Sequence, residues 1–196
     1  MKNILLLILC VVTLTSCARN IVISPNIAKI ERSSESQTRI KKNVGYYISD
    51  ESTKLKVITP GGGGDSVTYS PYSDIETAYN KMLTNVFERV HKLKTPSDVN
   101  AIKDENLSYI ITPKLVTNSS SSSILTWPPT RFTVDLTCEI RDATGKLIEN
   151  TRVVGEGQAE FRDLLADHAI AGKRATEDAL LKMQSALFDV RYENPR

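Results

Sequence analysis

The sequence has few of the residues that catalytic sites usually need. Its 196 residues include only two histidines, His91 and His168, and three cysteines. A hydrolase triad needs a nucleophile held against a base, and no nucleophile-elbow pattern or paired histidine spacing is present. The glycine run Gly61–Gly64 continues with Asp65-Ser66, without the lysine that a phosphate-binding loop requires. The sequence therefore predicts a protein that is not an enzyme and has no metal or cofactor.

Strong charge of one sign is also lacking. The formal net charge is +2, and it falls to +1 if the amino-terminal segment that contains Lys2 is removed. A nearly neutral chain has no long-range attraction for polyanions. The sequence therefore predicts no nucleic-acid partner.

No apolar run is long enough to cross a membrane. The longest, Ile4–Leu14, has eleven residues, whereas a spanning helix needs about 20. A positive start at Lys2, an apolar stretch of this length and small residues before Cys17 are the layout of a removable export signal.

The segment Leu14-Thr15-Ser16-Cys17 resembles the bacterial lipobox. That resemblance implies cleavage before Cys17, acylation of its thiol and amine, and a membrane-anchored mature protein. Ala18 follows, and by resemblance the absence of an aspartate there favours the outer membrane, on its periplasmic side. The alternative is an ordinary secretory signal with a chance cysteine.

Three segments follow from this pattern. Residues 1–16 are the signal peptide, residues 17–43 are the lipidated cysteine and a flexible tether, and residues 44–196 are a single periplasmic domain. An edge strand at Ile21–Ile23 is the alternative for part of the tether. With Cys17 acylated and Cys10 removed, Cys138 is the only free thiol, so no disulfide can form.

The domain contains both helical and strand patterns. Ser73-Asp74-Ile75-Glu76 is a capping-box pattern, and an apolar stripe from Ile75 to Leu93 predicts one helix that ends before Pro96. Alanine-rich residues 167–190 predict a second amphipathic helix, and residues 97–106 a short one. Strands are predicted at residues 44–48, 55–58 and 107–116, and Pro113 indicates a sheet edge or bulge in the last of them.

A long hairpin is the clearest feature of the carboxyl-terminal half. Apolar and polar residues alternate strictly from Phe132 to Arg141, which places Cys138 in the core. A turn at residues 142–145 leads to a returning strand at 147–161, in which Gly155 and Gly157 predict a bulge or bend. The whole pattern predicts an α+β fold, with a mainly antiparallel or mixed sheet and two amphipathic helices packed on one face.

The order of these elements over residues 44–190 resembles that of small periplasmic lipoproteins. The shared features are a strand ending in Thr112-Pro113, a hairpin with Gly155-Glu156-Gly157 and a terminal helix. The resemblance is to YajG-like and LpoB-like proteins, the amino-terminal domain of TolB and the periplasmic domain of CsgG. It implies non-catalytic accessory work in the cell envelope.

The loop from Ser119 to Pro129 is the candidate contact with a protein partner. It joins a serine tract to the only tryptophan, and tryptophan is enriched among residues that dominate interface energies. The predicted partner-binding residues are Ile124, Leu125, Trp127, Pro128 and Pro129. The alternative is that Trp127 folds back onto the core of its own domain.

These observations predict a lipid-anchored accessory or assembly factor that binds an envelope protein. Two alternatives remain. One is a carrier that holds a lipid or glycan between sheet and helices, and the other is a homo-oligomeric subunit of a secretion or envelope ring. Solid packing by Tyr79, Met82, Val86 and Met183 would exclude the carrier's cavity.

Overall fold

The computed structural model describes residues 18–32, 38–121 and 127–192. Their elements follow one another as β1 (Ala18–Asn20), α2 (Ile27–Arg32), β2 (Ile40–Tyr46), α3 (Asp50–Lys54), β3 (Val57–Pro60), β4 (Ser66–Tyr69), α4 (Pro71–Val86), β5 (Phe87–Lys92), α5 (Val99–Asp104), β6 (Tyr109–Ser120), β7 (Arg131–Asp142), β8 (Leu147–Gln158), α6 (Phe161–Ala166) and α7 (Ile170–Asp189). Cys17, Ile124 and Leu125 lie outside the described residues.

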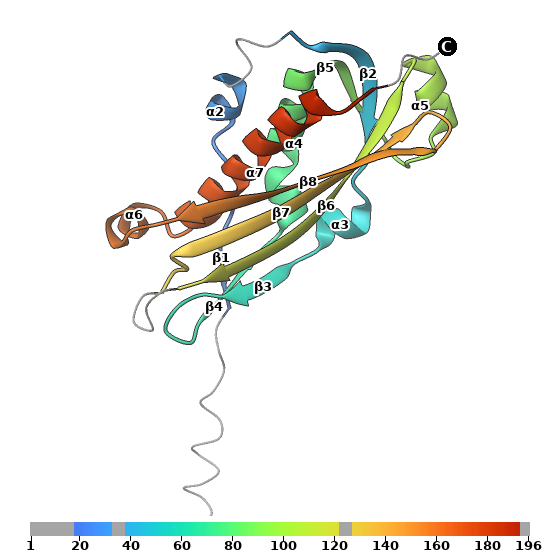
Figure 1. Cartoon of the computed structure of the whole chain (residues 1–196). Helices are drawn as coiled ribbons and strands as arrows, with labels where there is room; N and C mark the ends of the chain where they lie inside the picture. The colour runs from blue at the N-terminus through green and yellow to red at the C-terminus, as the bar shows by residue number, and fades with distance from the viewer. Residues whose placement is uncertain (1–17, 33–37, 122–126, 193–196) are drawn as a thin grey trace, which may run out of the picture.

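The main sheet has five strands in the order β5-β2-β6-β7-β8. β2 pairs in parallel with β5 and β6, and the three long strands β6, β7 and β8 pair antiparallel. A smaller sheet, β1-β4-β3, lies beside the far half of β6 (Figure 1). The predicted α+β class with a mixed sheet is confirmed.

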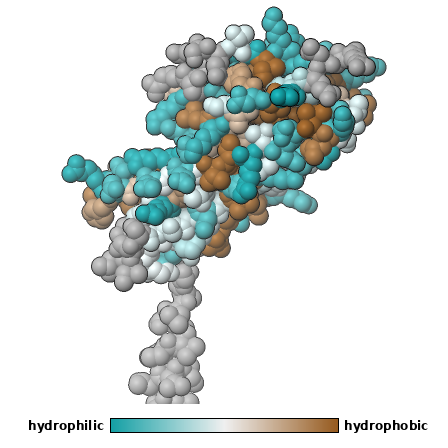
Figure 2. Space-filling view, in the orientation of Figure 1, coloured by the Kyte–Doolittle hydropathy of each residue, from teal (hydrophilic) through white to brown (hydrophobic). Residues whose placement is uncertain are grey.

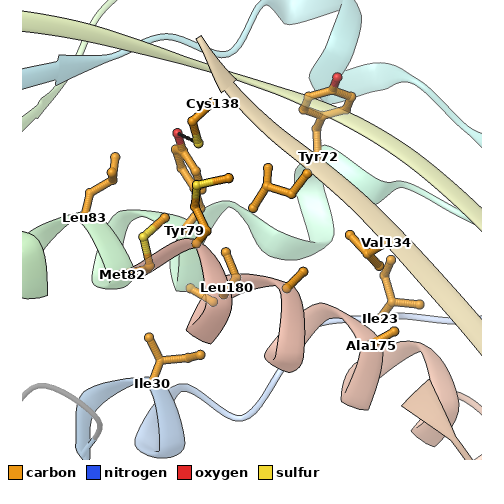
Figure 3. Close-up of a cluster of buried hydrophobic side chains, with 14 of the residues drawn as sticks. Ile23, Ile30, Tyr72, Tyr79, Met82, Leu83, Val134, Cys138, Ala175 and Leu180 are labelled. Atoms are coloured by element: carbon orange, nitrogen blue, oxygen red, sulfur yellow. Dashed lines mark hydrogen bonds between the residues drawn. The ribbon is translucent and has the colours of Figure 1, made fainter. Parts of the chain in front are cut away.

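The two long helices α4 and α7 cover one face of the main sheet, as the amphipathic stripes predicted. The inward side chains of β7 from Phe132 to Ile140 are all buried against them. Figure 3 shows Tyr79 of α4 reaching this strand, where its hydroxyl oxygen lies 3.3 Å from the Cys138 sulfur. Cys138 thus lies in the core, as its place in the alternation predicted.

The glycines of β8 do not form the predicted bulge or bend. The pairing of β7 with β8 is regular at Gly155 and Gly157. A Cβ atom would lie 2.2 Å from the Ala175 carbonyl oxygen at Gly155, and 2.0 Å from that of Ala171 at Gly157. The glycines are therefore there because α7 crosses the strand at backbone contact distance.

The first long helix is shorter at its end than its apolar stripe predicted. It begins at Pro71, a residue whose fixed φ suits the first turn, and the predicted capping box at Ser73 is not formed. It ends at Val86, and Phe87–Lys92 pairs with β2 as a strand. Sheet pairing has overridden a helical pattern in those six residues.

The segment predicted as a flexible tether is mostly part of the fold. β1 pairs in parallel with β4, Ile21 and Ile23 are buried, and Ile30 of α2 is fully buried between the helices. The side-chain amide of Asn85 on α4 donates to the Ile30 carbonyl (2.8 Å) and to Gln184 of α7 (2.9 Å). Three isoleucines of this largely polar segment belong to the core, so the tether prediction is wrong for residues 18–32. The prediction is also wrong for residues 40–43, which belong to β2.

The predicted edge position of Pro113 is confirmed. β2 pairs with β6 only as far as Ile111, and the amide of Leu115 donates to the Tyr72 hydroxyl instead of to a strand. Pro113 lies between these two residues, where no strand on that side needs its missing amide proton.

Candidate functional site

Trp127 packs against its own domain. Its ring meets the His168 ring edge-on with centroids 5.0 Å apart, and the Arg19 guanidinium carbon lies 4.1 Å from the indole centroid. Pro128 and Pro129 are buried, and Ser119 is a buried residue of β6 whose hydroxyl donates to the Pro60 carbonyl. The described residues of the predicted loop therefore pack against the domain itself. Partner binding by Trp127, Pro128, Pro129, Ile124 and Leu125 stays a prediction.

A groove of about 400 Å³ lies at the other end of the molecule, which we call the α5 groove. It is built on the face of the main sheet opposite to α4 and α7. Figure 1 shows α5 and the turn between β7 and β8 together at this end. The groove is lined by Tyr47, Pro96, Ser97, Val99, Ile102, Ile110, Thr112, Glu139, Arg141, Asp142, Ala143, Thr144 and Gly145.

The floor of the α5 groove belongs to a second, small apolar cluster. Leu93, Leu107 and Ile110 are buried in it, and Ile102 of α5 packs against them. Asp98 starts the helix by accepting a hydrogen bond from the Ala101 amide at 3.1 Å. α5 therefore covers only one corner of this sheet face, and the groove lies where its cover stops.

The charged groups at the rim of the groove all have polar partners, and Asp142 accepts hydrogen bonds from the Thr144 amide and hydroxyl at 2.8 and 2.6 Å. Glu139 accepts from Arg141 Nε at 2.7 Å and from Lys114 Nζ at 3.1 Å, and the Arg141 guanidinium also donates to the Gly145 carbonyl. These partners, Arg141 first, hold the pKa of Glu139 below its usual range. The groove thus offers an apolar floor inside a polar rim, which is the usual anatomy of a binding surface.

Sequence reasoning missed this groove, although one signal pointed to it. Ile110 and Ile111 are adjacent in a strand, so their side chains lie on opposite faces of the sheet. Both are buried. Two consecutive apolar residues indicate that both faces are covered at that point, and the predicted helix at residues 97–106 was the nearest element able to cover the second.

The two histidines and Cys138 lie apart from one another. His91 is on β5, with its Nε2 3.4 Å from Glu105 Oε2, and His168 faces Trp127. Burial raises the pKa of the Cys138 thiol to about 12, so the nucleophilic thiolate is not available at neutral pH. Within the described ranges, no cluster of three or more His, Cys, Asp or Glu side chains could bind a metal.

None of the helices in the described part of the chain has the length and apolar character needed to cross a membrane. No protein-family model matches the sequence, and no curated protein is detectably similar to it.

Solved structures that resemble this chain at low sequence identity include the following three. A Xanthomonas campestris protein of the family DUF330 is 8% identical, with a TM-score of 0.48 over 87% of this chain and 90% of its own. A candidate lipoprotein of Caulobacter crescentus is 15% identical, with a TM-score of 0.36 over 84% and 96%. A minor lipoprotein of Acinetobacter baumannii is 10% identical, with a TM-score of 0.42 over 76% and 93%. Similarity at this level shows neither the family nor the function of this chain.

Proposed function

We propose that this chain is a non-enzymatic lipoprotein, anchored by acylated Cys17 in the outer membrane on its periplasmic side. Its domain binds another envelope protein through the α5 groove. The observation that carries this proposal is an apolar floor, enclosed by α5 and a polar rim, on the open face of the main sheet. Val99 at the rim is 73% exposed, beside the buried Ile110, and such a floor suits an apolar anchor residue of a partner.

The carrier alternative is disfavoured by the packing of the main core. Tyr79, Met82, Val86 and Met183 have no exposed surface and fill the layer between sheet and helices. A lipid or glycan held in that layer would need a cavity where these side chains lie.

The ring-subunit alternative is disfavoured at the β8 edge of the main sheet. Side chains of α7 already bond the outward backbone groups at the end of β8. Asp178 accepts from the Glu156 amide at 2.9 Å, Lys182 donates to the Val154 carbonyl at 2.9 Å, and Arg174 donates to the Gln158 carbonyl at 2.7 Å. An edge occupied in this way is protected from the addition of a further strand.

Photo-crosslinking in cells tests the groove. A crosslinking amino acid at position 99 should form one discrete adduct with an envelope protein, and the same amino acid at position 116 should not. Val116 is a matched control because it is 70% exposed on the same sheet face but does not line the groove. Ala143→Arg, an exposed change that fills the groove, should abolish the adduct at 99.

Three results would contradict the proposal. Equal yields of the adduct from positions 99 and 116 would show that the partner does not bind specifically in the α5 groove. An adduct with lipid would support the carrier, and an adduct with a second copy of this chain would support the ring. A separate variant tests the anchor: Cys17→Ser should release the protein from the membrane fraction.

A further inference from the structure

The folded domain begins immediately after the predicted anchor. β1 starts at Ala18, which pairs with Ser66 of β4, and the Ile21 amide donates to the Thr68 carbonyl at 2.9 Å. Consecutive Cα atoms are about 3.8 Å apart. Acyl chains on Cys17 would therefore hold the β1 end of the domain against the lipid headgroups, with no tether between.

Large apolar side chains are exposed at this same end. Phe161 is 68% exposed and Leu165 is 70% exposed, and they lie four residues apart on one side of α6. Leu164, between them in sequence, is buried and fixes the helix on the domain. Val22, which is 56% exposed, follows β1.

Val22 and Leu165 belong to one surface. They line the same hollow of about 410 Å³, together with Asn20 and His168. Figure 1 places α6 and β1 at the end of the molecule opposite to α5, and Figure 2 shows apolar atoms at the position of α6. We call Val22, Phe161 and Leu165 the α6 face.

The charges around the α6 face are balanced, so they neither attract nor repel a membrane strongly. On α6 and at its start, the exposed charges of Arg162 and Glu160 offset each other, and three further basic side chains are in ion pairs. Arg19 lies 3.2 Å from Asp65, Lys173 lies 2.8 Å from Asp167, and Arg174 lies 2.7 Å from Asp163. Contact with lipid must then depend on insertion of apolar side chains, which is insensitive to salt.

We propose that the α6 face inserts at the boundary between headgroups and acyl chains of the leaflet that holds the anchor. The inference rests on the proposed acylation of Cys17, and it adds an orientation. The domain lies with α6 and β1 on the bilayer and presents the α5 groove away from it. Phe161 and Leu165 are exposed on one side of a helix, and β1 begins one residue after the proposed anchor. This arrangement fits a lipid surface better than a second folded partner.

A fluorescent probe at residue 165 tests the seating of the domain. Leu165→Cys is prepared in the full-length lipoprotein, labelled with an environment-sensitive fluorophore, and reconstituted in phosphatidylethanolamine and phosphatidylglycerol vesicles. Cys138 is buried and does not compete for the label. Val116→Cys is the matched control, and Phe161→Cys replaces the first variant if that variant folds poorly.

We expect the probe at 165 to be quenched several-fold more than the probe at 116 by lipids that carry a spin label near the headgroup. Iodide in the aqueous phase should quench the two probes in the opposite order. High salt should change neither result. Vesicle flotation and mass spectrometry of the amino terminus, on the same sample, report whether Cys17 is acylated.

The alternatives give distinguishable results. If Cys17 is acylated but iodide quenches both probes equally, the α6 face is wrong and the proposed anchor stands. If the probe at 165 is shielded from iodide but not quenched by lipid, a protein covers the face and the inference fails. If Cys17 is unmodified and the vesicles float without protein, the proposed function and the inference both fail.

Discussion

At the scale of single residues, two glycines of β8 set how closely α7 approaches the sheet. Gly157 leaves room for the Ala171 carbonyl, and a Cβ there would overlap that oxygen. Gly157→Ala should lower the free energy of unfolding by about 1–3 kcal/mol or more, because helix and strand would have to separate. Urea denaturation measures this change.

The neighbouring Gln158→Ala is the control for this prediction. Its side chain is exposed, so the effect should stay within about 0.5 kcal/mol. Equal stability of the Gly157→Ala protein and the parent would show that α7 does not lie at backbone contact with β8.

The buried Cys138 thiol predicts a loss of stability in alkali. Its ordinary pKa in an unfolded chain is about 8.5, and burial raises the folded value to about 12. Between these values the unfolded state loses a proton that the folded state keeps, so stability is fully present below about pH 8.5 and falls as the pH rises. Burial also raises the pKa of Tyr79 and of Tyr46, the latter to about 12, which extends the loss above about pH 10.

Cys138→Ala isolates the contribution of the thiol. Urea midpoints measured at several values between about pH 8.5 and 10, below the usual titration of tyrosine, should fall less steeply in the variant than in the parent. Parallel slopes in the two proteins would show that the thiol titrates normally in the folded state.

At the scale of elements, the N-terminal segment is the main difference between sequence and structure. In α2, Ile30 is fully buried while Ile27 is 41% exposed. Ile30→Ala should therefore cost about 2–5 kcal/mol of stability, and Ile27→Ala much less. Thermal denaturation of the two variants checks this. If both substitutions lowered the melting temperature by the same small amount, the segment would be a flexible tether after all.

Elements with regular local patterns could be predicted, and those decided by distant contacts could not. The alternation from Phe132 to Arg141 specifies β7 by itself, because one face of the strand is buried throughout. Phe87–Lys92 continues the apolar stripe of α4, yet its place beside β2 makes it a strand. The partner strand is more than 40 residues away in the chain, so no local pattern could show it.

The sites were less predictable than the fold. Trp127 was predicted to bind a partner because of its residue type. Its position, however, depends on Arg19 and His168, which contact it from other parts of the chain. The α5 groove is formed by four separate segments, and none of them has a motif. The α6 face could not be seen without knowing that β1 joins the domain.

At the scale of the whole molecule, the α5 groove and the α6 face lie at opposite ends. Because no linker separates Cys17 from β1, the proposed anchor determines which end meets the membrane. A flexible insertion of about ten Gly and Ser residues between Cys17 and Ala18 would separate anchor and domain by about 16–19 Å on average. Two apolar side chains bind lipid weakly, so the seating depends on a high effective concentration of the membrane surface, which the insertion lowers.

The insertion should reduce lipid quenching of a probe at residue 165 toward the level at residue 116. It should leave the melting temperature unchanged, because it breaks no contact of the described domain. A second variant, with Phe161→Asp and Leu165→Asp and no insertion, should keep the acyl anchor but lose the lipid contact of a probe at residue 22. Undiminished quenching at 165 after the insertion would mean that the short connection does not hold the domain on the bilayer, and the orientation of the α5 groove would then need another cause.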